Sequence, residues 1–126
     1  MGITNAGKAA MPDLVGDVNG INAFDYLAVG SSSTAFADTQ TTLGSEITGN
    51  GLERTQVTPT LTTTTVTNDT LQLQKQWTAS GSETVKEAGI FNASSAGTML
   101  ARKVMDSSHA LTATDTFTWT HQVVFA

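Results

Sequence analysis

Two segments of the chain alternate between apolar and polar residues, and this alternation constrains the fold more than any other feature. Residues 70–79 place Leu71, Leu73 and Trp77 on one side and mostly glutamine on the other. Residues 116–125 repeat the pattern with aromatic and β-branched side chains. Because successive side chains of a strand point to opposite faces, both segments are predicted to be half-buried β-strands.

A hairpin is predicted between these two segments. Residues 84–91 and 98–105 have strand composition, and the polar residues 92–97 between them are typical of a turn. Gly89 lets neighbouring backbones approach closely. Residues 106–113 are expected to form a polar connector. With further extended segments at 23–29 and 52–67, the chain is predicted to be mainly β, an antiparallel β-sandwich or barrel-like domain.

One or two short helices are expected in the N-terminal part. Residues 3–15 can start a helix at Thr4 or Asn5, and Gly7 and Pro12 limit it to about two turns. A second helix is predicted over 38–47, with two apolar residues one turn apart.

The length of 126 residues is typical of one domain. We expect residues 1–22 to form an N-terminal arm or short helix and residues 23–126 to form a single β-domain.

Composition excludes several classes of function. Only 13% of residues are charged and the net charge is −5, which argues against nucleic-acid binding because that requires a basic face. The chain has no cysteine for a disulfide or a zinc thiolate. It has neither a long apolar run nor a signal peptide at its start, so we expect no membrane partner and no export.

Catalytic chemistry is not indicated. His109 and His121 are the two histidines, and His121, on an apolar strand face, is expected to be a hydrogen-bonded residue of the sheet. A zinc site lacks a third nitrogen or sulfur ligand. We find no activated nucleophile and no acid/base pair, so no enzyme activity, cofactor or metal is expected.

Charged residues within strands are the more informative candidates. In a chain with so few charges, a carboxylate and a guanidinium placed in strands should be paired. We therefore expect Glu87 to pair with Arg54 or with Arg102, fixing strand register or joining subunits. The alternative, a set of solvent-facing charges, stays open at this point.

Trp77 and Trp119 raise the possibility of sugar binding, because exposed aromatic rings stack on sugars. Both, however, fall on the apolar side of their strands. The pattern therefore favours packing in the core.

An ordered set of short motifs resembles small structural modules of tailed-bacteriophage virions, of the tail-fibre or collar-like kind. The motifs lie at residues 26–35, 38–47, 53–54, 84–93, 97–102 and 115–121. The resemblance implies structural or interface roles at five signature positions: Glu46, Arg54, Glu87, Gly89 and Arg102.

The resemblance implies a virion structural protein, assembled in the host cytoplasm. Fibre proteins carry such a module before a long shaft, and this chain ends at Ala126, which favours a stand-alone coat component. We expect a trimeric capsid decoration protein that binds the major capsid protein, or other virion proteins, on the outside of the head. The alternatives are a tail-associated collar or fibre-base adaptor and a carbohydrate-binding module of a phage adhesin.

Overall fold

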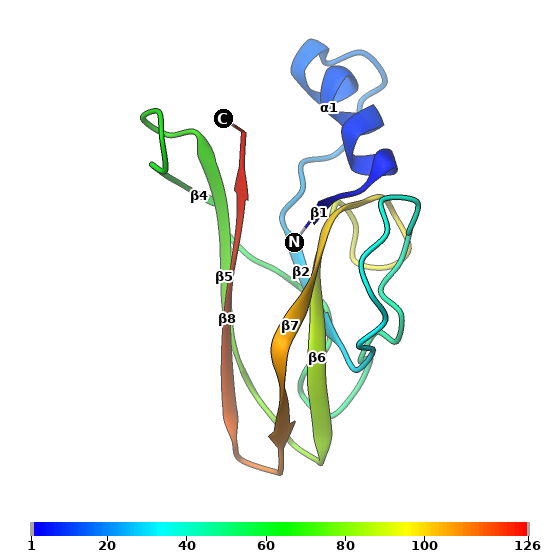
Figure 1. Cartoon of the computed structure of the whole chain (residues 1–126), viewed down its shortest axis with the longest axis vertical. Coiled ribbons are helices and arrows are strands. Elements are labelled where there is room, and N and C mark those ends of the chain that lie inside the picture. The colour runs from blue at the N-terminus through cyan, green and yellow to red at the C-terminus, as the bar shows by residue number, and fades with distance from the viewer. Residues whose placement is uncertain (1, 126) are drawn as a thin grey trace.

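Two antiparallel sheets face each other in the computed structural model, which describes residues 2–125 (Figure 1). Sheet A has the strand order β1-β7-β6-β2-β3 and sheet B the order β4-β5-β8. The elements are β1 (Gly2–Ile3), α1 (Asn5–Gly16), β2 (Tyr26–Gly30), β3 (Thr55–Gln56), β4 (Thr60–Thr62), β5 (Thr70–Thr78), β6 (Glu83–Phe91), β7 (Met99–Leu111) and β8 (Thr116–Val124). The predicted mainly-β antiparallel sandwich with a short N-terminal helix is confirmed. Among the described residues the sheets do not close into a barrel.

The two alternating segments form the neighbouring strands β5 and β8. Their register places Leu73 opposite His121 and Trp77 opposite Phe117, so the apolar sides of both strands share one face. That face covers sheet A, and the Trp77 and Phe117 rings stack with their centroids 6.2 Å apart. Trp77 is only 3% exposed, which confirms its predicted place in the core.

Sheet A is covered on both sides. One face packs against sheet B, and the other packs beneath the segment 31–54, where a second apolar cluster forms from Ala28, Leu43, Phe91 and Met99. Because both faces are dry, β2 and β6 have near-continuous buried runs instead of alternation.

The helix predicted over 38–47 is wrong. The segment is irregular in the structure and ends in an isolated bridge between Glu46 and Gly30. Its backbone amides have partners outside the segment: Gly44 and Ser45 donate to the Glu87 carboxylate, and Ile47 donates to the Val29 carbonyl. Tertiary bonds therefore replace the internal ladder that a helix needs.

The connector predicted over 106–113 is also wrong in most of its length. Strand β7 continues to Leu111 and pairs with the start of β6, with His109 opposite Val85. A register irregularity between Val85 and Glu87 interrupts this ladder. Residues 106–110 are all exposed, and β1 pairs with β7 only at Ala101 and Arg102, so a polar composition is compatible with a strand at this free edge.

Helix α1 begins where Thr4 caps it, since the Thr4 hydroxyl accepts a hydrogen bond from the Gly7 amide at 2.9 Å. It is one turn longer than expected, because Pro12 removes one amide without ending the helix. Asp17 ends it in a left-handed conformation with φ 51°. The Thr4 amide bonds to the Leu100 carbonyl, which fixes the helix start against β7.

Gly7→Ala is expected to loosen α1 and to lower the free energy of unfolding by about 1–2 kcal/mol. A Cβ at Gly7 would lie 2.5 Å from the Leu100 carbonyl oxygen and 2.9 Å from the Leu100 Cα, so backbone would have to move. Helix propensity alone favours alanine over glycine by about 1 kcal/mol, so it predicts the opposite sign. Urea unfolding and far-ultraviolet circular dichroism measure the effect, with the exposed Lys8→Ala as the control. A more stable Gly7→Ala variant would mean that α1 does not dock through Gly7.

Candidate functional site

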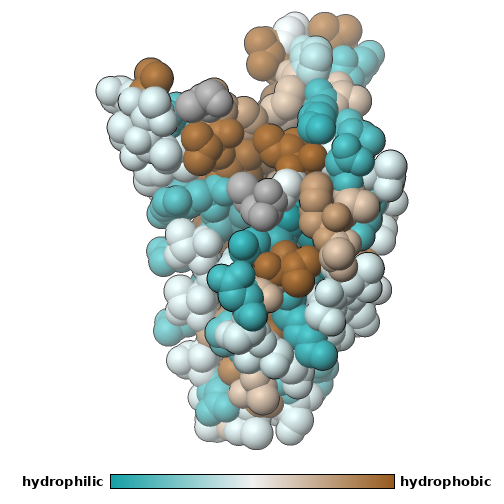
Figure 2. Space-filling model, viewed as in Figure 1, coloured by the Kyte–Doolittle hydropathy of each residue, from teal (hydrophilic) through white to brown (hydrophobic). Residues whose placement is uncertain are grey.

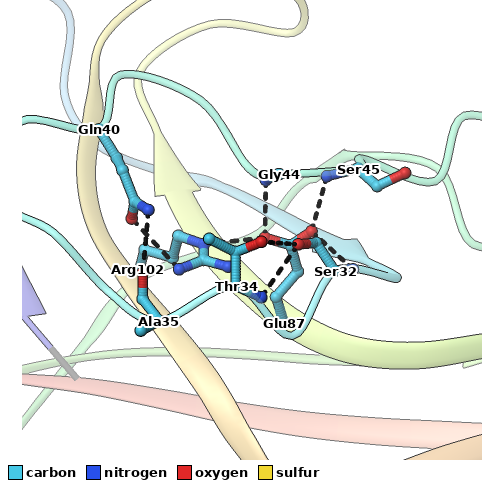
Figure 3. A network of polar contacts seen from close by, with 8 residues as sticks. All are labelled: Ser32, Thr34, Ala35, Gln40, Gly44, Ser45, Glu87 and Arg102. Atoms are coloured by element: carbon cyan, nitrogen blue, oxygen red, sulfur yellow. Dashed lines mark hydrogen bonds and ion pairs between the residues drawn. The ribbon is translucent and has the colours of Figure 1, made fainter.

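The four charged signature residues form two separate ion pairs. Arg102 Nε lies 2.8 Å from Glu87 Oε1, and both side chains are fully buried (Figure 3). Arg54 Nη2 lies 2.7 Å from Glu46 Oε1 nearer the surface. The predicted pairing of Glu87 is therefore made with Arg102 and not with Arg54. The alternative of four solvent-facing charges is wrong.

Glu87 is held by backbone amides as well as by the guanidinium. Its Oε1 accepts from the Gly44 amide at 2.9 Å, and its Oε2 accepts from the Ser45 amide at 2.8 Å and from the Ser32 amide at 3.1 Å. Figure 3 shows these donors converging on the carboxylate from the loop above β6. Glu87 thereby joins both ends of the segment 31–45 to sheet A.

Arg102 has a second polar partner in the same loop. Its Nη1 donates to Gln40 Oε1 at 3.2 Å, while Gln40 Nε2 donates to the Ala35 carbonyl at 3.1 Å (Figure 3). Within residues 2–125, Arg102 Nη2 has no hydrogen-bond partner. The pair thus depends on Nε for its closest charge contact.

The second pair fixes the hairpin turn between β6 and β7. Arg54 binds Glu46 through two nitrogens and donates Nη1 to the Ala93 and Ala96 carbonyls, each at 2.9 Å. Its Cζ also lies 3.7 Å above the centre of the Phe91 ring. Arg54 therefore locks the turn 92–97 against the segment that carries Glu46.

Gly89 leaves room for the Leu43 side chain. It lies opposite Ala28 on β2 and opposite Arg102 on β7. A Cβ at this position would lie 2.9 Å from the Leu43 Cδ2 atom. Gly89 thus lets the irregular segment pack closely on sheet A.

Sequence reasoning missed the residues that complete the Glu87 site. Ser32, Gly44 and Ser45 contribute backbone amides, which any residue type can supply. A weak signal existed at Gly30, where a Cβ would lie 2.5 Å from Glu87 Oε2. The geometry is that of a structural clamp, because a carboxylate without exposure cannot meet a substrate.

Residues 2–125 contain no cluster of three or more side chains suited to holding a metal ion. No helix there has the length and apolar character to cross a membrane.

Trp119 and His121 border a small hollow between the layers. It has a volume of about 180 Å³ and is lined by Lys103, Trp119, Thr120, His121 and Gln122. Trp119 Nε1 donates to His121 Nδ1 at 3.3 Å. Burial of the imidazole lowers the pKa of His121 to about 4, and the nearby Lys103 charge adds to the effect.

Apolar side chains are left uncovered at the end of the sandwich that carries α1. Leu61, Leu71 and Val123 are in register and share the inner face of sheet B, yet Leu61 is 61% exposed. Val15 and Val18, at the end of α1, are also exposed. Figure 2 shows apolar residues gathered in the notch between the two layers at this end. Exposed apolar patches are a common feature of protein contact surfaces.

Residues 22–124 match a family model described as Gp80, podophage GP4 fiber I protein gp80. The match includes both ion pairs and every strand of sheet B, and it begins after α1. The comparison with curated proteins gives no match.

Proposed function

The chain belongs to the podophage GP4 fiber I protein gp80 family and is therefore a fibre-type structural component of a phage virion, and from this premise we propose that it is a tail-associated collar or fibre-base adaptor. The observation that carries the proposal is the family match across nearly the whole β-sandwich. We propose that the protein is assembled into the virion in the host cytoplasm. We propose no catalytic role and no cofactor for it.

The clamped architecture supports a mechanical role. The segment 31–54 is the longest irregular part of the domain. Glu87 on β6 holds it to sheet A by accepting hydrogen bonds from the Ser32, Gly44 and Ser45 amides. Arg54, within the segment, donates to the Ala93 and Ala96 carbonyls of the β6–β7 turn. A module that transmits load between virion proteins benefits from loops that cannot swing freely. Buried, fully directed polar contacts provide this because they tolerate few alternative geometries.

The apolar end supports attachment to other virion proteins. The domain leaves apolar surface uncovered at Leu61 on β4, at Phe125 just after β8, and at Val15 and Val18 near the end of α1. Burying such surface drives most protein association. We propose that this end contacts the neighbouring virion protein. The expected trimer stays a prediction.

Copy number tests the proposal. Peptides of this chain and of the major capsid protein are quantified by mass spectrometry in purified particles, and again in separated heads and tails. A tail adaptor is expected at a small fraction of the capsid copy number and in the tail fraction. A copy number comparable to that of the capsid protein, with the chain on isolated heads, would contradict the proposal and support the capsid decoration role.

The structure weakens the glycan-binding alternative at one of its two residues. The Trp77 ring is buried, and its Nε1 donates to the Glu53 carbonyl at 3.0 Å, so it cannot stack on a sugar. Trp119 is partly exposed beside the small hollow. Tryptophan fluorescence unchanged by host glycans is expected.

A further inference from the structure

Strand β8 forms one edge of sheet B, and it is a long edge. The sheet order β4-β5-β8 leaves one side of its nine residues without a neighbouring strand. The opposite edge, β4, has only three residues. A long free edge presents a row of unpaired amides and carbonyls, which is a template for another strand.

Backbone hydrogen bonds at both ends of β8 show which of its residues face this free side. The Phe125 amide donates to the Asp69 carbonyl at 2.9 Å, and the Asp115 carbonyl accepts from the Ala79 amide at 2.7 Å. Odd-numbered residues therefore direct their backbone groups towards β5, and alternation directs the even-numbered ones outwards. Within residues 2–125, no backbone hydrogen bond joins the even-numbered residues of β8 to another segment: Thr116, Thr118, Thr120, Gln122 and Val124.

The usual protections of an edge are missing from β8. Natural edges carry charged side chains, proline or bulges that prevent pairing. The sequence Thr116–Val124 contains no charged residue and no proline, and its pairing with β5 is regular throughout. In a domain with net charge −5, an uncharged nine-residue edge adds no like-charge repulsion of its own between two copies.

The side chains of β8 are complementary to a reversed copy of the same strand. If two copies run antiparallel with Thr120 opposite Thr120, Phe117 lies opposite Val123 and Trp119 lies opposite His121 on the inner face. Thr118 lies opposite Gln122 on the outer face, where hydroxyl and amide groups already bond across β5 and β8, as from Gln74 to Thr120 at 2.9 Å. Apolar residues thus meet apolar or aromatic ones, and polar residues meet polar ones.

We propose that β8 is a homotypic pairing edge, through which two copies of this chain join antiparallel around Thr120 into one continuous six-stranded sheet. The contact is two-fold and isologous, so the same residues serve both copies. It does not depend on where in the virion the protein sits, and it differs from the threefold contact that the resemblance implied.

Charge substitutions at Thr120 test the register. Thr120→Lys places two lysines opposite each other, and Thr120→Glu places two glutamates there, so each variant alone is expected to dimerise at least about fivefold more weakly than the wild-type chain. An equimolar mixture of the two is expected to form the mixed dimer in preference to either homodimer. Sedimentation velocity gives the dissociation constants, and native mass spectrometry distinguishes the mixed dimer.

Two further variants separate edge pairing from general surface effects. Gln76→Lys, exposed on β5 next to β8 but not at the edge, is expected to dimerise like wild type. Thr118→Pro removes an outward amide without removing a bond to β5, and is expected to be monomeric with an unchanged circular dichroism spectrum. The proposal would be overturned by a wild-type chain that stays monomeric at every concentration reached in these experiments. A trimer whose dissociation constant does not change with the charge placed at Thr120 would also overturn it.

Discussion

Arg102→Met is expected to lower the free energy of unfolding by about 3–5 kcal/mol, because it leaves the Glu87 carboxylate buried without its cation. Neither side chain is exposed, so water cannot replace the lost partner. The three backbone amides that also bind Glu87 satisfy its hydrogen bonds but carry no full charge. Urea unfolding should show a lower midpoint with an unchanged slope.

Two variants give this prediction its controls. Lys86→Met neutralises a cation one position before Glu87 that is not fully buried, and it is expected to cost less than about 1 kcal/mol. The double variant Glu87→Gln/Arg102→Met removes both charges and is expected to be more stable than Arg102→Met alone. A double variant as unstable as the sum of its parts would show that the charges are not coupled.

The strands that face water on one side could be predicted from the sequence. In β5 and β8, one face lies on sheet A and the other faces solvent, so buried and exposed positions alternate along each strand. Apolar and polar residues alternate in the sequence for the same reason. The β6–β7 turn was equally visible, because Asn92 and Gly97 are turn residues. Each of these signals is local, and each was sufficient by itself.

The irregular segment could not be predicted, because its conformation depends on partners distant in sequence. Leu43 and Ile47 have helical spacing, but Leu43 packs on Phe91 and Ile47 bonds to Val29. Glu87 acts as the anchor for the segment from more than 40 residues away. Local spacing cannot report such contacts, which explains why the helix prediction was wrong.

The charge pairs fall between these two cases. Sparse charge implied that Glu87 and an arginine would meet, but two arginines were available and spacing did not distinguish them. The strand register distinguishes them, because Arg102 lies opposite Gly89, two residues from Glu87 on β6, and this places the Arg102 side chain beside Glu87. Arg54 enters from outside the hairpin and binds Glu46, a pairing that requires the fold of the irregular segment.

Acidification from pH 6.5 to pH 4 is expected to lower the free energy of unfolding by up to about 3 kcal/mol through His121 alone. Burial lowers the pKa of His121 to about 4 in the folded protein, whereas an exposed histidine titrates near 6.5. At pH values between these two pKa values, the histidine is protonated in the unfolded chain and neutral in the folded chain. The stabilisation is therefore complete above about pH 6.5 and is lost as the pH falls towards 4.

His121→Leu is expected to remove this dependence, and urea unfolding at pH 7.5, 6.5, 5.5 and 4.5 measures it. His109→Gln serves as the control, because His109 is exposed and the variant should keep the wild-type dependence.

Asp69 does not interfere with this measurement. Hydrogen bonds from the amides of Val66, Thr64 and Thr65 hold the pKa of Asp69 well below the usual range. Its contribution to the pH dependence of stability therefore begins only as the carboxyl of the unfolded chain titrates, near pH 4. If His121→Leu loses stability with the same slope as the wild-type chain, another group is responsible. A flat profile in His121→Leu beside a falling one in the wild-type chain would instead show that the loss comes from protonation of the His121 imidazole, whose Nδ1 can accept from Trp119 only while it is unprotonated.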